Sequence, residues 1–319
     1  MKKKYYLILD TETATVPFAG TIARNEQEKK NIAIAKPLVY DIGWTISDRQ
    51  GNIIKKENYL VQETFFVPQI FNTAYYRDKR PQYMEMFGKR EIEALPWNNI
   101  IEILLQDCRN ADFVCAYNAA FDFKKAIPFT EKYIKALYSN YYQKWEDRQI
   151  ESCKQIVNGC NNAKNEKYLE PIFELRNEEF PIVDLWGLAC QRLINNRRYK
   201  NYCLKNGLLT QSGLYFKSSA ETSFQYLARE YNFIESHTAL DDALIETKIL
   251  AKALQKGKVY PMISAFPFRE LGYTYDYIRR NPKYKQVVID KINSYLSEKN
   301  DNSKYTNRLL NIISILETI

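Results

Sequence analysis

The sequence predicts an α/β protein with a mixed sheet of about five strands flanked by helices. Two apolar runs, residues 39–47 and 53–61, flank a polar turn and predict an antiparallel hairpin. Together with the apolar run at residues 5–9, this hairpin makes a three-stranded meander. The apolar run at residues 112–117 follows a long crossover, which favours a strand parallel to the first one. A short strand at residues 181–184 completes the predicted sheet.

The helices are predicted from capping residues and from the spacing of apolar residues. Pro96 suits the first position of a helix that runs to about Arg109. The residues of one apolar face recur along it at helical spacing: Ile100, Ile103, Leu104 and Cys108. Asn118 follows the strand at residues 112–117 and opens the next helix. Two further helices are expected from their caps. One begins at the capping box of Ser218 and Glu221 and runs to about Tyr231, and the other begins at the cap of Thr238 and Asp241 and runs to about Leu254. Helices are also expected at Leu185–Ile194, Pro282–Leu296 and Asn302–Leu316. Residues 202–216 resemble a hairpin or loop.

The chain divides into two predicted parts. Residues 1–257 form an α/β domain, and residues 258–319 form a helical C-terminal extension. Two segments interrupt the domain. The first is a polar, irregular excursion at residues 16–37, and the second is a charged and aromatic insertion at residues 130–167 that is expected to be helical and extended.

Composition limits the class of protein. The 319 residues are 45% hydrophobic, which is enough for a sizeable core, and the mean hydropathy is −0.48. No apolar run approaches the roughly 20 residues that span a bilayer, so we expect no membrane association. A basic start, Met1–Lys4, precedes an apolar run that is too short for a signal peptide. We therefore expect a cytoplasmic protein.

Six cysteines lie far apart, and none forms a Cys-x-x-Cys pair. Free thiols in a reducing compartment are expected. A zinc site built from Cys153 and Cys160 with Cys190 or Cys203 is an alternative, which the poor spacing disfavours.

The net charge of +8 fits a polyanionic partner. The 25 tyrosines and 16 phenylalanines supply many rings on which nucleobases could stack, although most are expected in the core.

Two acids, Asp10 and Glu12, directly follow the first apolar run. Residues two apart on a strand face the same side, so the two carboxylates project together. Carboxylates aimed at one point repel each other unless a cation lies between them. The pair therefore indicates a divalent-metal site, or else an ordinary solvated strand end.

Two further groups of polar residues lie at the ends of predicted elements. Asp122 follows the strand at residues 112–117, in the first turn of a helix. His237 is the one histidine of the chain, and Asp242 follows it by five residues at the start of another helix. Negative charge is favourable at a helix N-terminus, which is a structural reason for Asp242 that involves no ligand. In an open α/β sheet, however, sites form beyond the carboxyl ends of strands, where both Asp10 and Asp122 are expected.

Taken in order, the motifs Asp-x-Glu-Thr at residues 10–13, Asn-x-x-Phe-Asp at residues 118–122 and His-x-x-x-x-Asp at residues 237–242 resemble a known family. They are similar to those of the DEDD superfamily of 3′–5′ exonucleases, and more narrowly of its DnaQ-like, histidine-containing branch (DEDDh). The resemblance covers roughly residues 4–256 and implies a ribonuclease-H-like fold.

The resemblance also implies a two-metal mechanism. Two Mg²⁺ or Mn²⁺ ions would be held by Asp10, Glu12, Asp122 and Asp242. His237 would be the general base that takes a proton from the attacking water. Substrate contacts are expected at Thr11, Thr13, Asn118 and Phe121.

Three functions remain open from the sequence. The first is a 3′–5′ exonuclease on DNA, in proofreading, repair or replication, which releases nucleoside 5′-monophosphates. The second is the same chemistry on RNA, and the third is an inactive nucleic-acid-binding domain. The expected partner is a nucleic-acid 3′ end, DNA rather than RNA. A polymerase or other replication protein is a further candidate partner that no residue of the chain specifically supports.

Overall fold

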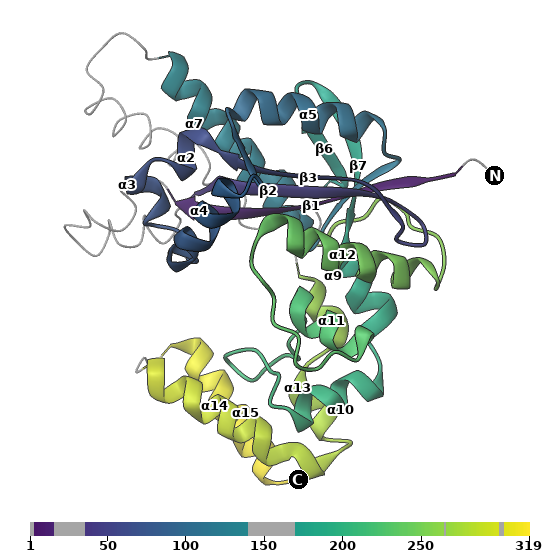
Figure 1. Ribbon diagram of the computed structural model, residues 1–319. Helices are drawn as coiled ribbons and strands as arrows, with labels where there is room; N and C mark the ends of the chain where they lie inside the picture. Colours follow the sequence, from purple (N-terminus) through teal and green to yellow (C-terminus); the bar gives the residue numbers. More distant parts are fainter. Residues whose placement is uncertain (1–2, 16–35, 140–169, 265, 300–302) are drawn as a thin grey trace. The chain divides into compact units, whose positions relative to one another are not determined.

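Figure 1 shows the protein as a computed structural model, which describes residues 3–15, 36–139, 170–264, 266–299 and 303–319. The chain forms two compact units. Unit 1 comprises Met1–Leu185, Glu235–Leu254 and Lys258–Ala265, and unit 2 comprises Trp186–Ile234, Gln255–Gly257 and Phe266–Ile319. The sequence places a boundary after residue 257, whereas residues 186–234 belong to the same compact unit as most of the C-terminal segment.

Seven strands of the described chain form one mixed sheet in unit 1, so the α/β class is confirmed and the expected number of five strands is wrong. In spatial order they are β4 (Glu93–Leu95), β3 (Ile53–Val61), β2 (Pro37–Asp48), β1 (Tyr5–Thr15), β5 (Phe113–Ala116), β7 (Glu178–Asp184) and β6 (Ile172–Leu175). The pairs β1–β2, β2–β3 and β6–β7 are antiparallel, and β1–β5, β5–β7 and β3–β4 are parallel. The predicted meander and its parallel continuation are therefore present.

The two unpredicted strands lie at the edges of the sheet. At three residues, β4 is too short to show an alternating pattern. The strands β6 and β7 are joined by a tight turn in which Arg176 (φ 52°) and Asn177 (φ 66°) are both left-handed. A two-residue hairpin turn of this kind usually contains glycine, and the absence of glycine here removes the usual sequence signal.

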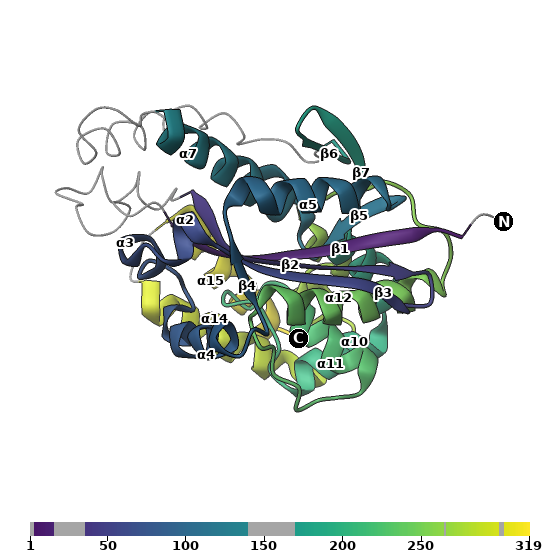
Figure 2. The same ribbon diagram turned by 45° about the horizontal axis from the view of Figure 1, so that its top comes forward.

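Helices cover both faces of the sheet (Figures 1 and 2). The helices α5 (Trp97–Arg109) and α7 (Ile127–Ser139) lie on one face, and α12 (Ala239–Leu254) lies on the other. The shorter elements of unit 1 are α2 (Gln62–Phe65), α3 (Pro68–Phe71), η1 (Arg77–Lys79), α4 (Arg80–Gly88), α6 (Ala119–Phe121) and the π-helical turn η2 (Asp122–Ala126). Pro96 is the N-cap residue of α5 and not its first helical residue, so the helix begins one residue later than predicted.

Two of the predicted segments are only partly described. Of the predicted insertion, residues 130–139 are the end of α7, which continues the helix that begins at α6, and the remainder lies outside the described residues. The excursion expected after Thr15 also lies largely outside them.

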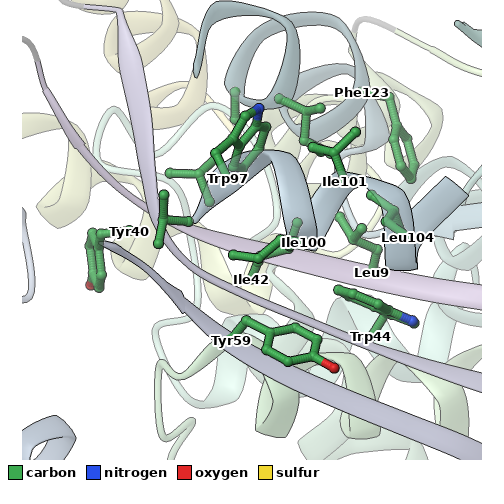
Figure 3. Close-up of a cluster of buried hydrophobic side chains, with 14 of the residues drawn as sticks. Leu9, Tyr40, Ile42, Trp44, Tyr59, Trp97, Ile100, Ile101, Leu104 and Phe123 are labelled. Atoms are coloured by element: carbon green, nitrogen blue, oxygen red, sulfur yellow. The ribbon is translucent and has the colours of Figure 1, made fainter. Parts of the chain in front are cut away.

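The core between the sheet and α5 is aliphatic and aromatic (Figure 3). Its central side chains are Leu9, Ile42, Trp44, Trp97, Ile100, Ile101, Leu104 and Phe123. The Trp44 Nε1 atom donates a hydrogen bond to Asp107 Oδ2 at 2.8 Å, and Lys55 Nζ pairs with the same carboxylate at 2.7 Å. The buried indole N–H and the buried carboxylate are thereby both satisfied, as burial requires.

The opposite face of β2 is adapted to α12. Because side chains alternate along a strand, Gly43 and Thr45 face away from Ile42 and Trp44. Thr45 Oγ1 lies 2.7 Å from Thr247 Oγ1 on α12. A Cβ atom at position 43 would lie 2.4 Å from the backbone nitrogen of Leu240. Only glycine allows the first turn of α12 to approach β2 this closely.

Unit 2 is helical within the described residues. Its elements are α9 (Leu185–Ala189, whose first residue belongs to unit 1), η3 (Cys190–Ile194), α10 (Arg197–Lys205), α11 (Ala220–Ala228), η4 (Pro267–Leu271), α13 (Thr274–Ile278), η5 (Pro282–Tyr284), α14 (Lys285–Lys299) and α15 (Lys304–Glu317). The helix from Leu185 and the two C-terminal helices confirm the predictions.

Two local predictions for unit 2 differ from the structure in detail. The segment predicted as a hairpin or loop begins inside α10, and a loop follows in which Leu209 and Phe216 pair as an antiparallel bridge and the Lys217 N–H donates to the Leu208 carbonyl at 2.9 Å. The cap of α11 is Ser219, whose side chain accepts a hydrogen bond from the Thr222 N–H, and not Ser218. The Ser218 hydroxyl instead accepts a hydrogen bond from the Trp186 indole at 2.9 Å. Adjacent serines cannot be distinguished by the capping pattern alone.

Four cysteines of the described chain are buried: Cys108, Cys115, Cys190 and Cys203. The other two lie outside the described residues, so the zinc alternative stays open. Among the residues that the structure describes, no helix has the length and hydropathy needed to cross a membrane.

Candidate functional site

The strand β1 carries Asp10 and Glu12 past the end of its parallel neighbour. The last parallel pair between β1 and β5 joins Ile8 to Cys115, whereas β1 continues to Thr15 alongside β2. Both acids therefore lie within the strand, which extends well beyond the apolar run at residues 5–9 that predicts it. The two acids still lie beyond the carboxyl end of β5, where sites form in open α/β sheets.

The start of α12 meets this part of β1. One ligand atom from each of Glu12, His237 and Asp242 lies within 4.8 Å of the other two. The close approach at Gly43 explains the meeting, because Gly43 is the β2 partner of Asp10. The structure thus brings together the first and third sequence motifs, which are more than 200 residues apart.

A second contact attaches α12 to β2. Asp41 lies opposite Glu12 in the register of β1 and β2. Its carboxylate accepts a hydrogen bond from the Ala239 N–H at 2.9 Å. The same Oδ2 atom accepts one from the Tyr83 hydroxyl at 2.7 Å. An acceptor at a helix N-terminus satisfies a backbone N–H that has no partner within the helix. Asp41 therefore fixes the first turn of α12, on which Asp242 is carried.

The second motif joins the site through Asp122. This residue begins η2, is buried, and accepts a hydrogen bond of 2.6 Å from Thr11 Oγ1. Burial raises the pKa of Asp122 to about 7, against the lowering effect of the Thr11 hydroxyl. Thr11 was expected to contact substrate. It is itself buried, and its hydroxyl is directed to the carboxylate.

The other expected substrate residues occupy different environments. Asn118 has a left-handed backbone (φ 71°), and its N–H donates to Asp184 Oδ1 at 3.2 Å. Phe121 is half-buried against the core. Thr13 is half-buried on β1, just after a register shift that follows Glu12.

Two buried acids near the site were missed by the sequence reasoning. Glu246 lies four residues after Asp242, hence on the same face of α12, and its Oε2 accepts the Tyr117 N–H at 3.1 Å. Asp184 ends β7 and accepts the backbone N–H of Asn118. The available signals were the helical spacing from Asp242 and the position of Asp184 at a strand end, like that of the predicted acids.

The carboxylates of the site strongly disfavour each other's ionisation. Burial, followed by the charges of Glu246 and Asp122, raises the pKa of Asp10 well above its ordinary value. Burial, followed by the charge of Asp242, raises the pKa of Glu12 to about 9. Burial and nearby carboxylates raise the pKa of Asp242 to about 8. Each shift shows that negative charge is costly here without a neutralising partner.

A cation fits this arrangement. The buried Oδ1 atom of Asp242 accepts no hydrogen bond from the residues that the structure describes. A buried carboxylate oxygen normally has a partner. Carboxylate oxygens are also the ligands that Mg²⁺ and Mn²⁺ prefer. Asp10, Glu12, Asp122 and Asp242 thus offer the type of ligand atom that could hold the ions implied by the resemblance, although the group within ligand distance in the described residues is Glu12, His237 and Asp242.

His237 is held by residues from another part of unit 1. Its ring stacks on that of Tyr76, with 4.1 Å between centroids and 15° between planes. Its Nδ1 atom lies 3.7 Å from Glu235 Oε2. Its backbone is left-handed (φ 51°), and Lys79 Nζ donates a hydrogen bond to the preceding carbonyl, that of Ser236. Nothing in the sequence around Tyr76 has a period that would have linked it to the histidine.

The aromatic stretch from Phe65 to Tyr83 has two roles in the structure. Phe65, Phe71 and Tyr83 are buried in the core. Tyr76 stacks on His237, and its neighbour Tyr75 is 86% exposed.

Comparison with known proteins gives no assignment. No known family model matches the chain, and no curated protein matches it. The functional argument therefore depends on the residues and on their geometry.

Proposed function

We propose that the protein is a metal-dependent 3′–5′ exonuclease, with DNA as the preferred polymer. The observation that carries the proposal is the convergence of Glu12, His237 and Asp242 within 4.8 Å, with the half-buried Asp10 close enough for its pKa to be raised by the charges of Glu12 and Asp242. A cluster of acids with a single histidine is the donor set needed for hydrolysis assisted by two divalent ions. The order and spacing of the motifs, which resemble the DEDDh exonucleases, support the same chemistry.

The carboxylates and the histidine would have separate roles. Asp10, Glu12, Asp122 and Asp242 would hold Mg²⁺ or Mn²⁺, which supplies a lowered pKa for bound water and stabilises charge on the phosphate. His237 would take the proton of the attacking water. Glu235 lies beside Nδ1 and favours a proton on that nitrogen, which leaves Nε2 as the acceptor. Tyr76 would keep the imidazole ring in place by stacking.

Glu246 adds a further buried carboxyl group to this site, and burial raises its pKa well above the ordinary value. Its carboxylate is fixed by the Tyr117 N–H and raises the pKa of Asp10. We assign it the role of strengthening cation binding from behind Asp10, because residues that support metal ligands commonly change metal affinity by about 10–100-fold.

The test is a set of 3′- and 5′-labelled oligonucleotides, single-stranded, double-stranded and mismatched, of DNA and of RNA. We expect stepwise release of nucleotides from the 3′ end of DNA with Mg²⁺ or Mn²⁺, and none with EDTA. Asp10→Asn and Asp242→Asn should abolish release. Glu174→Gln, which removes an exposed acid on β6, should not change it. Undiminished release by Asp10→Asn would refute the proposal.

The same experiment separates the alternatives. Faster degradation of RNA would assign the chemistry to RNA processing. Binding of oligonucleotides without any release, together with no saturable Mn²⁺ binding, would indicate an inactive binding domain. The complete set of four acids with the histidine argues against that last outcome.

A further inference from the structure

Unit 2 carries the positive charge of the chain. Unit 2 has 17 basic residues (Lys and Arg) and only 8 acidic ones (Asp and Glu). Unit 1 has 29 basic and 30 acidic residues. The net charge of +8 therefore arises entirely in unit 2. A domain with such an excess attracts polyanions. The candidate site lies in unit 1, so this charge is not needed to build it.

Unit 2 also has a continuous group of aromatic side chains, which we call the aromatic row. Its members are Phe266, Phe268, Tyr215 and Tyr273. Successive ring centroids along the row are 6.0, 4.8 and 4.8 Å apart. Phe266 is 41% exposed, and the other three rings are half-buried. A row that reaches solvent in this way differs from a closed core.

An exposed arginine lies over a ring at each end of the row. The guanidinium of Arg269 is 4.1 Å from the ring centroid of Phe266. That of Arg308, on α15, is 5.2 Å from the centroid of Tyr273. The Arg308 guanidinium also donates hydrogen bonds to the side chains of Tyr273 and Tyr275. A guanidinium has five N–H donors, so those that are not used within the protein can bind phosphate oxygens.

The backbone holds part of this surface in place. Tyr215 and Tyr273 form an antiparallel bridge, and the Thr274 N–H donates to the Leu214 carbonyl at 3.0 Å. The Thr274 hydroxyl donates to the carbonyl of Gly213 at 2.6 Å. Two segments that are distant in sequence are therefore joined where the row crosses from one to the other. A surface that is already ordered loses little entropy when a ligand binds.

We propose that the aromatic row and its two arginines bind single-stranded nucleic acid. Nucleobases would stack on Phe266 and the neighbouring rings, and Arg269 and Arg308 would contact phosphates. Stacking needs free base faces, which a duplex conceals, so a single strand fits better than a double helix. The combination of aromatic platforms with a basic surface is the usual design for binding single strands without sequence preference. The inference goes beyond the proposed function, because no residue of the row belongs to the candidate site and no hydrolysis is required.

The test is the affinity of the full chain for a fluorescent oligothymidylate, measured by anisotropy in EDTA so that no hydrolysis occurs. Phe266→Ala and Phe266→Leu should each weaken binding about 5- to 150-fold, because both remove a stacking ring. Arg308→Ala should also reduce the slope of log affinity against log salt by about 0.7, the value for one phosphate contact on a single strand. Far-ultraviolet circular dichroism and thermal unfolding of each variant would show that it is folded.

Matched controls lie in the same unit. Tyr231→Ala removes a 54%-exposed tyrosine outside the row, and Arg279→Ala removes an exposed arginine outside it. Both should bind like the wild type. If row and control variants lose affinity equally, or if heparin competes as well as unlabelled oligothymidylate does, binding depends on charge alone and the inference is wrong.

The outcome is distinguishable from that of the nuclease test. Normal binding by the row variants, together with Mg²⁺-dependent nucleotide release by the wild type, would overturn this inference and leave the proposed function intact. Loss of binding in the row variants without any release by the wild type would support this inference and overturn the proposed function.

Discussion

Replacing Gly43 by alanine tests how the site is assembled. The added Cβ would lie 2.4 Å from the Leu240 nitrogen and 2.6 Å from the Leu240 Cα, where ordinary van der Waals contact begins near 3.4 Å. Both atoms belong to backbone and cannot rotate away. The first turn of α12 must therefore move by about 1 Å, and a displacement of this size at a catalytic group costs about 100-fold in rate. Since α12 carries Asp242, we expect Gly43→Ala to lose about that much activity.

The same substitution should also change stability. Overpacking of this kind costs about 1–3 kcal/mol of the free energy of unfolding, which urea denaturation would measure. Because Asp242 would move away from Glu12, the stabilisation that Mn²⁺ gives to the folded protein should shrink as well. The control is Gly88→Ala at the end of α4, where an added Cβ has no atom within 4 Å. It should be neutral or about 0.4–1 kcal/mol more stable.

An unchanged Gly43→Ala variant would contradict the proposed link between packing and the site. If Gly43→Ala unfolds at the urea concentration of the wild type, responds equally to Mn²⁺ and retains full activity, the close approach of α12 to β2 does not set the position of Asp242. A loss of stability with unchanged Mn²⁺ response would leave the packing argument valid and refute its link to the site.

The remaining predictions concern charge and ring stacking. Asp10→Asn should raise the free energy of unfolding of the metal-free protein, measured by calorimetry, because it removes an acid whose ionisation is costly in the folded state. The same substitution should abolish nucleotide release in the oligonucleotide assay. Glu246→Gln should weaken Mn²⁺ binding about 10–100-fold in isothermal titration, and an unchanged dissociation constant would exclude its supporting role. Tyr76→Phe should keep the pH–rate profile of the wild type, whereas Tyr76→Ala should lower kcat and shift the acidic limb of that profile, because the stacked ring positions the general base His237. The free energy of unfolding of the metal-free protein should fall as the pH rises from about 4 to about 9. Glu12 and Asp242 have pKa values near 4 in the unfolded chain, and burial raises them to about 9 and about 8 in the folded protein. In this range the folded state therefore retains protons that the unfolded state has lost. Stability that rises with pH over that range in EDTA would contradict the assignment of these groups as buried and unneutralised.

The sequence predicts those features that local physics determines. The strand at residues 53–61 has the predicted limits, and α5 and α12 follow their caps and apolar faces closely. The proximity of Glu12 and Asp242 was expected only because three motifs resemble those of one family. Nothing in their local patterns specifies that β1 and α12 pack together.

The features that the sequence did not predict depend on contacts between distant segments. Glu246 lies on a mostly apolar helix, and its importance appears only when Tyr117 is placed beside it. Tyr76 comes from a stretch without periodicity and reaches His237 through the fold. Gly43 has the one signal that could have been used, because a glycine inside a strand often marks a close approach of another backbone.

The two units differ in the electrostatic task that each could perform. In unit 1, burial and neighbouring carboxylates raise the pKa of Asp10, so the acid cluster offers a phosphate group no attraction until cations are bound. In unit 2, basic residues outnumber acidic ones by 17 to 8, so a polyanion is attracted whether or not cations are present. Affinity for substrate and the rate of its hydrolysis should therefore respond to different substitutions. Phe266→Ala should raise KM with little change in kcat, whereas Asp242→Asn should abolish kcat and leave oligonucleotide binding in EDTA unchanged.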